Sequence, residues 1–248
     1  MSTIEHGRTP FVFSTTADEV LVGVDLSGKR AIVTGGSTGI GLATTKALAK
    51  AGAEVTIATR NIDRAGLVAD ELNKTAGNKN ILVSHLDLSD LQSVKSFANA
   101  WDGPLDILIN NAGIMALPTK QISAQGFEMQ FAINHLGHFA LSVFLHDALQ
   151  IANNARVVSV SSQAHSFAPI DFDDINFDAR TYDPTLAYCQ SKTANALFAV
   201  GAAQRWSDDG ICVNAVTPGA IVTHLQDNLG GFTVELPPEM IKTPEQGA

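Results

Sequence analysis

Ala31-Ile32-Val33-Thr34-Gly35-Gly36-Ser37-Thr38-Gly39-Ile40-Gly41 is the stretch of sequence that decides the fold. A short apolar run leads into closely spaced glycines, and a helical pattern over residues 39–51 follows at once. Glycine permits a tight turn and a close backbone approach, while the helix start offers free N–H groups and the positive end of its dipole. The stretch therefore predicts a dinucleotide-binding turn. The competing interpretation is a glycine-rich turn that binds nothing.

The alternation of short apolar runs and longer helical patterns continues along the rest of the chain. Repeated strand–helix–strand units indicate parallel strands with crossover helices, and continuous apolar strands suit a sheet covered on both faces. We therefore predict one α/β domain with a Rossmann-like, doubly wound parallel sheet of strand order 3-2-1-4-5-6. The expected helices cover residues 39–51, 62–75, 89–101, 123–149 and 185–207, and the expected strands are Ala31–Thr34, Glu54–Ala58, Ile81–Leu86, Asp106–Ile109, Arg156–Val160 and Ile211–Val216.

The composition limits the classes of function. The 248 residues are 45% hydrophobic and 17% charged, enough to bury the core of one large domain. The formal net charge of −9 disfavours a broad nucleic-acid surface. No run approaches the roughly 20 apolar residues that span a bilayer, and the N-terminus lacks an apolar signal-peptide core, so we expect a cytoplasmic protein without a transmembrane segment. Residues 1–28 show no sustained period, and we expect them to extend a domain formed by residues 29–248.

The cysteines and histidines form no metal-binding motif. Cys189 and Cys212 lack the spacing of metal ligands or of a disulfide framework. His135 and His138 could in principle chelate a metal from one helix face. No partner motif supports such a site, so packing or a polar contact is the favoured interpretation and no metal is expected.

The residues after the second and third strands bear on the choice of cofactor. NAD sites usually place an acidic side chain at the end of the second strand, where this sequence has Thr59-Arg60. An arginine instead suits the 2′-phosphate of NADP(H) through charge-assisted hydrogen bonds, and its alternative role is a solvated surface charge. Asp87 follows the third strand, where its carboxylate could accept from an adenine amino group or cap the next helix.

One expected helix face places a polar residue among apolar ones. Asn134 lies in a stripe of residues spaced three or four apart, and a buried amide needs hydrogen-bond partners. It is either a satisfied structural asparagine or part of a site, and the spacing alone favours the structural role. The stripe consists of Phe127, Phe131, Asn134, His138, Leu141 and Leu145.

A tyrosine, a lysine and a serine carry the pattern of proton-transfer chemistry. Tyr188 and Lys192 are four apart in a helical stretch, so their side chains share a face. An unperturbed tyrosine has a pKa of about 10, and a nearby ammonium stabilises the phenolate and lowers that pKa. Ser162 follows the fifth strand, at the carboxyl edge where open α/β sheets bind ligands, and its hydroxyl could orient a substrate oxygen.

Six motifs occur in one order along the chain: Thr34-Gly35-x-x-x-Gly39-x-Gly41, Asn110-Asn111-Ala112-Gly113, Asn134, Ser161-Ser162, Tyr188-x-x-x-Lys192 and Pro218-Gly219-x-x-x-Thr223. Together they resemble the classical short-chain dehydrogenase/reductase family, from about Asp25 to the end of the chain. Residues 188–195 and the long segment before Tyr188, which contains residues 170–177, resemble its retinol-dehydrogenase-like branch.

The resemblance implies NADP(H)-dependent hydride transfer between a carbonyl compound and an alcohol. Tyr188 would be the general acid in reduction and the base in oxidation. Lys192 would hold the nicotinamide ribose and lower the tyrosine pKa. Ser162 would bind the substrate oxygen, with Ser161 as the less favoured neighbour. Asn134 would hold a water in a proton relay to Lys192, which replaces the structural interpretation of that residue.

The resemblance also implies a set of cofactor-binding residues in the glycine turn and at the strand ends. Besides Tyr188 and Lys192, they are Gly35, Ser37, Thr38, Gly39, Ile40, Gly41, Arg60, Asn61, Asp87, Leu88, Asn111, Ala112, Gly113, Pro218, Gly219, Ile221 and Thr223.

The last residues depart from the family pattern. The family continues with another helix and a seventh strand, whereas residues 242–248 resemble only the start of that helix, so we expect the seventh strand and part of the substrate wall to be absent. Residues 116–117 and 167–169 indicate a small apolar substrate, and family analogy favours a homodimer. A nonenzymatic NADP(H)-binding regulator and an epimerase/dehydratase-type enzyme stay open as alternative functions.

Overall fold

Six parallel strands form the central sheet of the protein. The computed structural model describes residues 9–77, 79–223, 225 and 237–248. The strand order is β3-β2-β1-β4-β5-β6, which confirms the predicted order, and each strand begins and ends within one residue of its prediction. The strands are β1 (Arg30–Thr34), β2 (Glu54–Thr59), β3 (Ile81–His85), β4 (Ile107–Asn110), β5 (Ala155–Val160) and β6 (Ile211–Val216).

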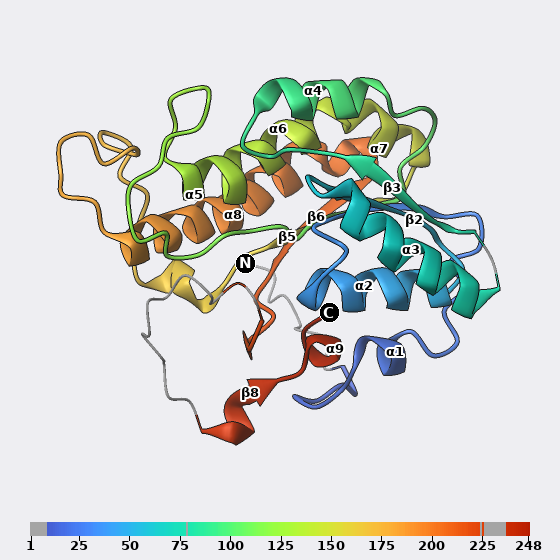
Figure 1. Cartoon of the computed structure of the whole chain (residues 1–248). Helices are drawn as coiled ribbons and strands as arrows, with labels where there is room; N and C mark the ends of the chain where they lie inside the picture. Colours follow the sequence, from blue (N-terminus) through green and yellow to red (C-terminus); the bar gives the residue numbers. More distant parts are fainter. Residues whose placement is uncertain (1–8, 78, 224, 226–236) are drawn as a thin grey trace, which may run out of the picture.

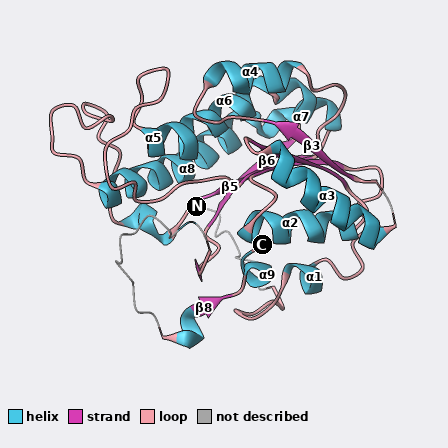
Figure 2. Ribbon diagram, in the orientation of Figure 1, coloured by secondary structure: helices cyan, strands magenta, loops and turns pink. Residues whose placement is uncertain are grey.

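Helices cover both faces of this sheet, as the continuous apolar strands predict (Figures 1 and 2). On one face, α2 (Gly39–Lys50) and α3 (Ile62–Ala76) pack against side chains such as Val33 and Ile57. The other face carries α4 (Leu91–Asn99), α6 (Gly137–Phe144), α7 (His146–Ala152) and α8 (Pro184–Trp206), which enclose Leu108 and Val157. Because the neighbouring strands all pair in parallel, their carboxyl ends lie at one edge of the sheet, where the candidate site lies.

The predicted helix over residues 123–149 is divided into several elements. Its first residues form a loop that closes with an antiparallel bridge between Ile122 and Glu128. The Glu128 carboxylate accepts hydrogen bonds from the backbone N–H groups of Gln130 and Phe131, so the helix begins only after it. The elements that follow are α5 (Met129–Phe131), the π-helical turn η1 (Ala132–Leu136), α6 and α7. A single helical period therefore predicted the buried positions from Phe131 to Leu145 correctly. It was wrong for Phe127, which lies before the helix and is half-buried, and it missed where the helix begins and breaks.

N-terminal caps decide where two other predicted helices begin. Asp90 accepts from the backbone N–H of Gln92, so α4 begins two residues later than predicted. Asp183 caps the start of α8, where Pro184 occupies the first helical turn. Local hydrogen bonds therefore decide these boundaries, and the spacing of apolar residues gives no information about them.

The described part of the N-terminal segment packs on the end of the glycine-turn helix. It contains the short helix α1 (Ala17–Val20), and Asp18 forms an ion pair with Lys50 of α2 at 2.6 Å. The side chain of Gln246, in α9 (Pro244–Gly247), donates to the carbonyl oxygen of Ser14 at 3.2 Å. A small second sheet pairs β7 (Ala220–Ile221) with β8 (Ile241–Lys242). Within the described ranges, no helix has the length and apolar character needed to cross a membrane.

Candidate active site

A cleft of about 160 Å³ opens where the carboxyl ends of β1 to β4 meet the glycine turn. It brings together predicted residues from four separate strand ends, as expected for an open parallel sheet. The predicted residues that line it are Gly35, Arg60, Asp87, Leu88, Ala112 and Gly113, and Ala58, Thr59, Leu86, Ile114 and Ile133 complete the wall. Of that second group, sequence reasoning had singled out only Thr59, as the residue before Arg60.

The glycine turn is packed too tightly for side chains. Gly35 has φ +66°, and a Cβ there would lie 3.2 Å from Ala112. A Cβ at Gly41 would collide with the carbonyl oxygen of Gly35 and lie 2.6 Å from the Asn111 amide nitrogen. Side chains at these two positions would therefore force the turn to shift.

The first turn of α2 is not capped by the side chain of its N-cap residue. Thr38 is the N-cap residue, but its side chain makes no capping hydrogen bond. The first backbone N–H groups of a helix have no partner inside the helix, and they lie at the positive end of its dipole. Ser37 is buried beside this turn, and Ile40 and Gly41 belong to its first residues. The chain therefore fits a bound pyrophosphate at the predicted position.

The residues of the predicted Pro218–Thr223 motif lie beside the same helix start. A Cβ on Gly39 would lie 3.3 Å from the Thr223 side chain, which places the end of the motif against the glycine turn. Gly219 has φ +97°, a conformation that favours glycine, and Ile221 is buried in β7. The fold therefore brings this late motif to the phosphate end of the cleft.

Arg60 and Asn61 have different environments although they are adjacent. Arg60 is exposed and lines the cleft just after β2. Asn61 accepts a hydrogen bond from the backbone N–H of Arg64 at 3.0 Å and caps α3. Arg60 therefore carries the only side-chain cation among the residues lining this described cleft.

Asp87 lines the cleft and does not cap the following helix. Its carboxylate accepts from the backbone N–H and the hydroxyl of Ser89 at 2.9 and 2.6 Å. Asp90 caps α4 instead, so the helix-capping alternative for Asp87 is wrong. Leu88 is buried beside it, against the backbone of Gly137.

Asn111 holds the glycine turn in place through hydrogen bonds to Thr34. Its side-chain amide donates to the carbonyl oxygen of Thr34 at 2.8 Å, and its backbone N–H donates to the Thr34 hydroxyl at 2.9 Å. The backbone N–H of Ala112 reaches the same hydroxyl at 3.0 Å. The two turns that follow β1 and β4 are therefore fixed to each other through Thr34.

Tyr188 and Lys192 are buried on one face of α8, with 5% and 3% of their surface exposed. Ser162 lies next to Tyr188, where hydrogen bonding from its hydroxyl acts to lower the tyrosine pKa, and its oxygen accepts from the Ala164 backbone N–H at 3.2 Å. Ser161 is directed elsewhere, because its hydroxyl donates to the carbonyl oxygen of Lys192 at 2.8 Å. The structure therefore brings Ser162, and not Ser161, to the tyrosine hydroxyl.

The predicted lowering of the tyrosine pKa is wrong in this structure. Burial raises the pKa of Tyr188 to about 12 and outweighs the opposing effect of the hydrogen bond from Ser162. The Lys192 ammonium is directed at the carbonyl oxygen of Val160, at 3.0 Å. Burial also lowers the pKa of Lys192 to about 8. The two groups share a helix face as predicted, but desolvation decides their pKa values.

The Asn134 side chain is fully engaged with protein groups. Its amide nitrogen donates to the Ile114 carbonyl oxygen and to the Ser191 hydroxyl, both at 2.9 Å, and its oxygen accepts from the Ile114 backbone N–H. The same oxygen and the Lys192 nitrogen both face Gly113, at 3.3 and 3.7 Å from where a Cβ would lie. Asn134 is therefore a satisfied structural amide, and it also lies next to the lysine.

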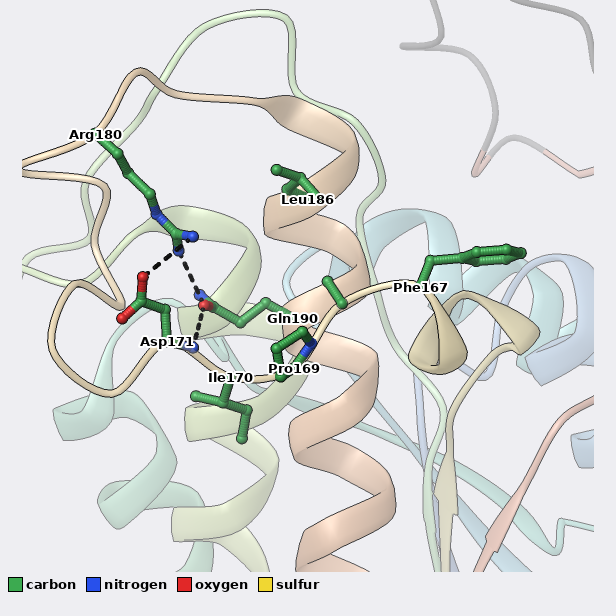
Figure 3. Close-up of a pocket in the computed structure, with 8 residues that line it drawn as sticks. Phe167, Pro169, Ile170, Asp171, Arg180, Leu186 and Gln190 are labelled. Atoms are coloured by element: carbon green, nitrogen blue, oxygen red, sulfur yellow. Dashed lines mark hydrogen bonds and ion pairs between the residues drawn. The ribbon is translucent and has the colours of Figure 1, made fainter.

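A larger pocket lies behind the tyrosine. It has a volume of about 370 Å³ and includes Phe167, Ala168 and Pro169, which we expected to contact substrate (Figure 3). Its α8 side chains are Leu186 and Gln190, each two residues from Tyr188 and hence about 200° around the helix. The helix therefore separates this pocket from the Tyr188 side chain. The expected Ala116 is buried, and its N–H donates to Gln130.

Comparisons with known proteins agree with the geometry. Residues 29–173 match the family model described as short chain dehydrogenase. The chain is similar to "Probable oxidoreductase" of Streptomyces antibioticus, with 52% identity over 236 residues that cover 91% of this chain and 79% of that protein. It is 41% identical over 230 residues to retinol dehydrogenase 11 of Homo sapiens, covering 91% of this chain and 72% of that protein. A solved structure, the Pseudomonas aeruginosa RhlG/NADP active-site complex, superposes with a TM-score of 0.65 at 27% identity, covering 87% of this chain and 80% of the other.

Proposed function

Because the chain belongs to the short-chain dehydrogenase family, in its retinol-dehydrogenase-like branch, we propose that it is an NADP(H)-dependent oxidoreductase that interconverts a carbonyl compound and an alcohol. The observation that carries this proposal is the burial of Tyr188 and Lys192 together on one face of α8, with the ammonium nitrogen 5.6 Å from the centre of the tyrosine ring and Ser162 next to the tyrosine. A proton donor, an oxygen-binding hydroxyl and an ammonium are therefore close together. The glycine cleft that could hold a dinucleotide lies at the same edge of the sheet.

The protein residues handle the proton, and a bound nicotinamide would supply or accept the hydride. With its pKa near 12, Tyr188 keeps its proton at neutral pH and is in the form that a general acid needs for reduction. Ser162 would donate a hydrogen bond to the substrate oxygen as negative charge develops there. In oxidation the same tyrosine would take the proton back.

Lys192 would act through position and charge. Its ammonium has three donors, of which one goes to the Val160 carbonyl oxygen, so the others could bind ribose hydroxyls. Charged Lys192 would stabilise a developing phenolate on Tyr188 when substrate and cofactor exclude water. Asn134 would support the lysine through a water held near its oxygen, beside Gly113.

The choice of NADP(H) rests on Arg60. This exposed cation lies in the wall of the cleft, directly after β2, where a 2′-phosphate would accept charge-assisted hydrogen bonds. Asn61 keeps α3 capped next to it and would fix the direction of the chain at this point. The NADP complex of the similar RhlG structure supports the same preference.

The test is NADPH oxidation with a panel of apolar aldehydes and ketones, and NADP⁺ reduction with the matching alcohols. We expect turnover with at least one pair, and loss of that turnover in Tyr188→Phe. NADPH binding with no turnover in either direction across the panel would favour the nonenzymatic regulator. Turnover that survives in Tyr188→Phe would contradict the proposed acid.

A further inference from the structure

A continuous line of buried hydrogen bonds joins the glycine turn to the helix that carries Tyr188. The Thr34 hydroxyl lies 2.8 Å from Nε2 of His138, and Nδ1 of His138 lies 3.0 Å from the Asn134 carbonyl oxygen. The Asn134 amide donates to the Ser191 hydroxyl at 2.9 Å, and that hydroxyl donates to the Tyr188 carbonyl oxygen at 2.7 Å. All five residues are at most 5% exposed. The line therefore crosses the core from the cofactor cleft to the proposed acid.

The partners of His138 fix its tautomer. The Asn134 carbonyl oxygen can only accept, so Nδ1 carries the proton. The Thr34 hydroxyl accepts from the backbone N–H groups of Asn111 and Ala112. Its one hydrogen can go to Nε2 of His138 at 2.8 Å or to the Ile109 carbonyl oxygen at 3.3 Å, and the shorter contact favours Nε2. The neutral imidazole thus donates at one nitrogen and accepts at the other. Burial, aided by the charge of Lys192, agrees with this because it lowers the pKa of His138 to about 3.

His138 connects the part of the fold that forms the cleft to the part that carries Tyr188. Thr34 ends β1 and holds both turns that form the cleft, while Asn134 lies in the π-helical turn and contacts the loop after β4 and α8. Thr34 and His138 are 104 positions apart in the chain, so only the fold joins them. A shift of His138 would move the cleft relative to the tyrosine helix.

We propose that His138 is a positioning residue for hydride and proton transfer. Its neutral imidazole holds the Asn134 backbone to Thr34 and thereby sets the distance between the cofactor cleft and the Tyr188 hydroxyl. It does not exchange a proton with substrate. The inference rests on the proposed function, because it assigns His138 a role in that reaction. Misplacement of reacting groups by about 1 Å can slow a reaction by roughly 10²-fold.

The experiment compares three substitutions in the full chain. His138→Leu removes both hydrogen bonds, His138→Asn keeps a donor near Nδ1, and His138→Gln keeps an acceptor near Nε2. We measure the Kd for NADPH, the single-turnover rate of hydride transfer, and the isotope effect with NADPH deuterated at the transferred position. In His138→Leu we expect a rate loss of about 10- to 100-fold, a Kd within about fivefold of the parent, and a larger isotope effect. The Asn and Gln variants should recover part of the rate.

The matched control is Leu145→Ala, which opens a cavity in the same stripe without touching the hydrogen-bonded line. A folded His138→Leu variant with the parental rate of hydride transfer would overturn the proposal. So would a rate loss in His138→Leu that is no larger than the rate loss in Leu145→Ala, when the two variants are equally stable. If His138→Leu does not fold, His138→Asn and His138→Gln carry the test, and a parental single-turnover rate in both of them would overturn the proposal.

The pH profile separates positioning from proton transfer. Because the imidazole stays neutral, the rates of the parent and of His138→Gln should depend on pH in the same way between pH 5 and 8. Lys192 and His135 are the titratable groups whose charges act on this imidazole, and both remain in every variant. An inflection in the parent that the variant lacks would make His138 a proton-transfer group. A parent that binds NADPH and reduces no carbonyl would instead contradict the proposed function itself.

Discussion

The ammonium nitrogen of Lys192 lies 5.6 Å from the centre of the Tyr188 ring, and both side chains are buried. A helical spacing of four brings the two groups onto one face. Burial then shifts the pKa of each group away from its ordinary value. Burial raises the pKa of the tyrosine and lowers that of the lysine, so at pH 7 Tyr188 is neutral, whereas Lys192, with a pKa of about 8, is still charged.

Tyr188→Phe should abolish most turnover and leave cofactor binding intact. The substitution keeps the ring and removes only the hydroxyl that would donate the proton. We expect kcat to fall by about 10²–10⁴-fold, the usual effect of losing a general acid, with an NADPH Kd close to that of the parent. Steady-state kinetics with a carbonyl substrate and a fluorescence titration of NADPH check both quantities. Near-parental turnover in a step limited by chemistry would show that another group supplies the proton.

Lys192→Met should change the dependence of stability on pH. The folded-state pKa of Lys192 is about 8, below its ordinary value of 10.5, so between these pH values the unfolded chain binds the additional proton. The parent should therefore gain stability as pH rises through this window. Relative to Lys192→Met it should be less stable below pH 8, by up to about 3 kcal/mol, and the gap should close near pH 10.5.

Denaturant unfolding of both proteins at pH 7, 9 and 10 measures this gap. A difference that does not change with pH would mean that the buried lysine has an ordinary pKa. The same variant should also bind NADPH more weakly and turn over more slowly, because Lys192 would contact the ribose as well as support Tyr188.

Arg60→Ala should remove most of the preference for NADP(H) over NAD(H). Charge-assisted hydrogen bonds to a phosphate contribute about 1.5–3 kcal/mol, so the affinity ratio of the two cofactors should fall by roughly 10- to 100-fold. Arg64→Ala is the matched control, because Arg64 lies in the first turn of α3 and outside the cleft lining. Titrations of both cofactors decide the result. Equal affinities in the parent protein would contradict the NADP(H) assignment.

Gly41→Ala and Gly66→Ala should have opposite effects although both glycines are helical. A Cβ on Gly41 meets the Gly35 carbonyl oxygen and the Asn111 amide, so the glycine turn must shift and NADPH binding should be lost. A Cβ on Gly66 in α3 meets no atom within 4 Å. That variant should gain about 0.5–1 kcal/mol of stability and bind NADPH normally. Thermal unfolding with and without NADPH distinguishes the two, and normal binding in Gly41→Ala would exclude a close backbone approach to the cofactor.

The sequence by itself determined the sheet, the glycine turn and the pairing of Tyr188 with Lys192. Each depends on neighbours in the chain: apolar runs for the strands, glycines between strand and helix, and a spacing of four on α8. It also predicted that Arg60 and Asp87 lie at adjacent strand ends, because parallel strands present their carboxyl ends at one edge. These features need no knowledge of distant contacts.

The tertiary structure alone decided the partners and the environment of these residues. Only the fold ties Asn134 to Ser191 and brings His138 to Thr34. Burial in the fold raises the pKa of Tyr188, whereas its spacing of four residues from Lys192 had predicted a lower pKa. Periodicity is a property of neighbouring positions, whereas desolvation and long-range hydrogen bonds depend on which atoms the folded chain packs around each group.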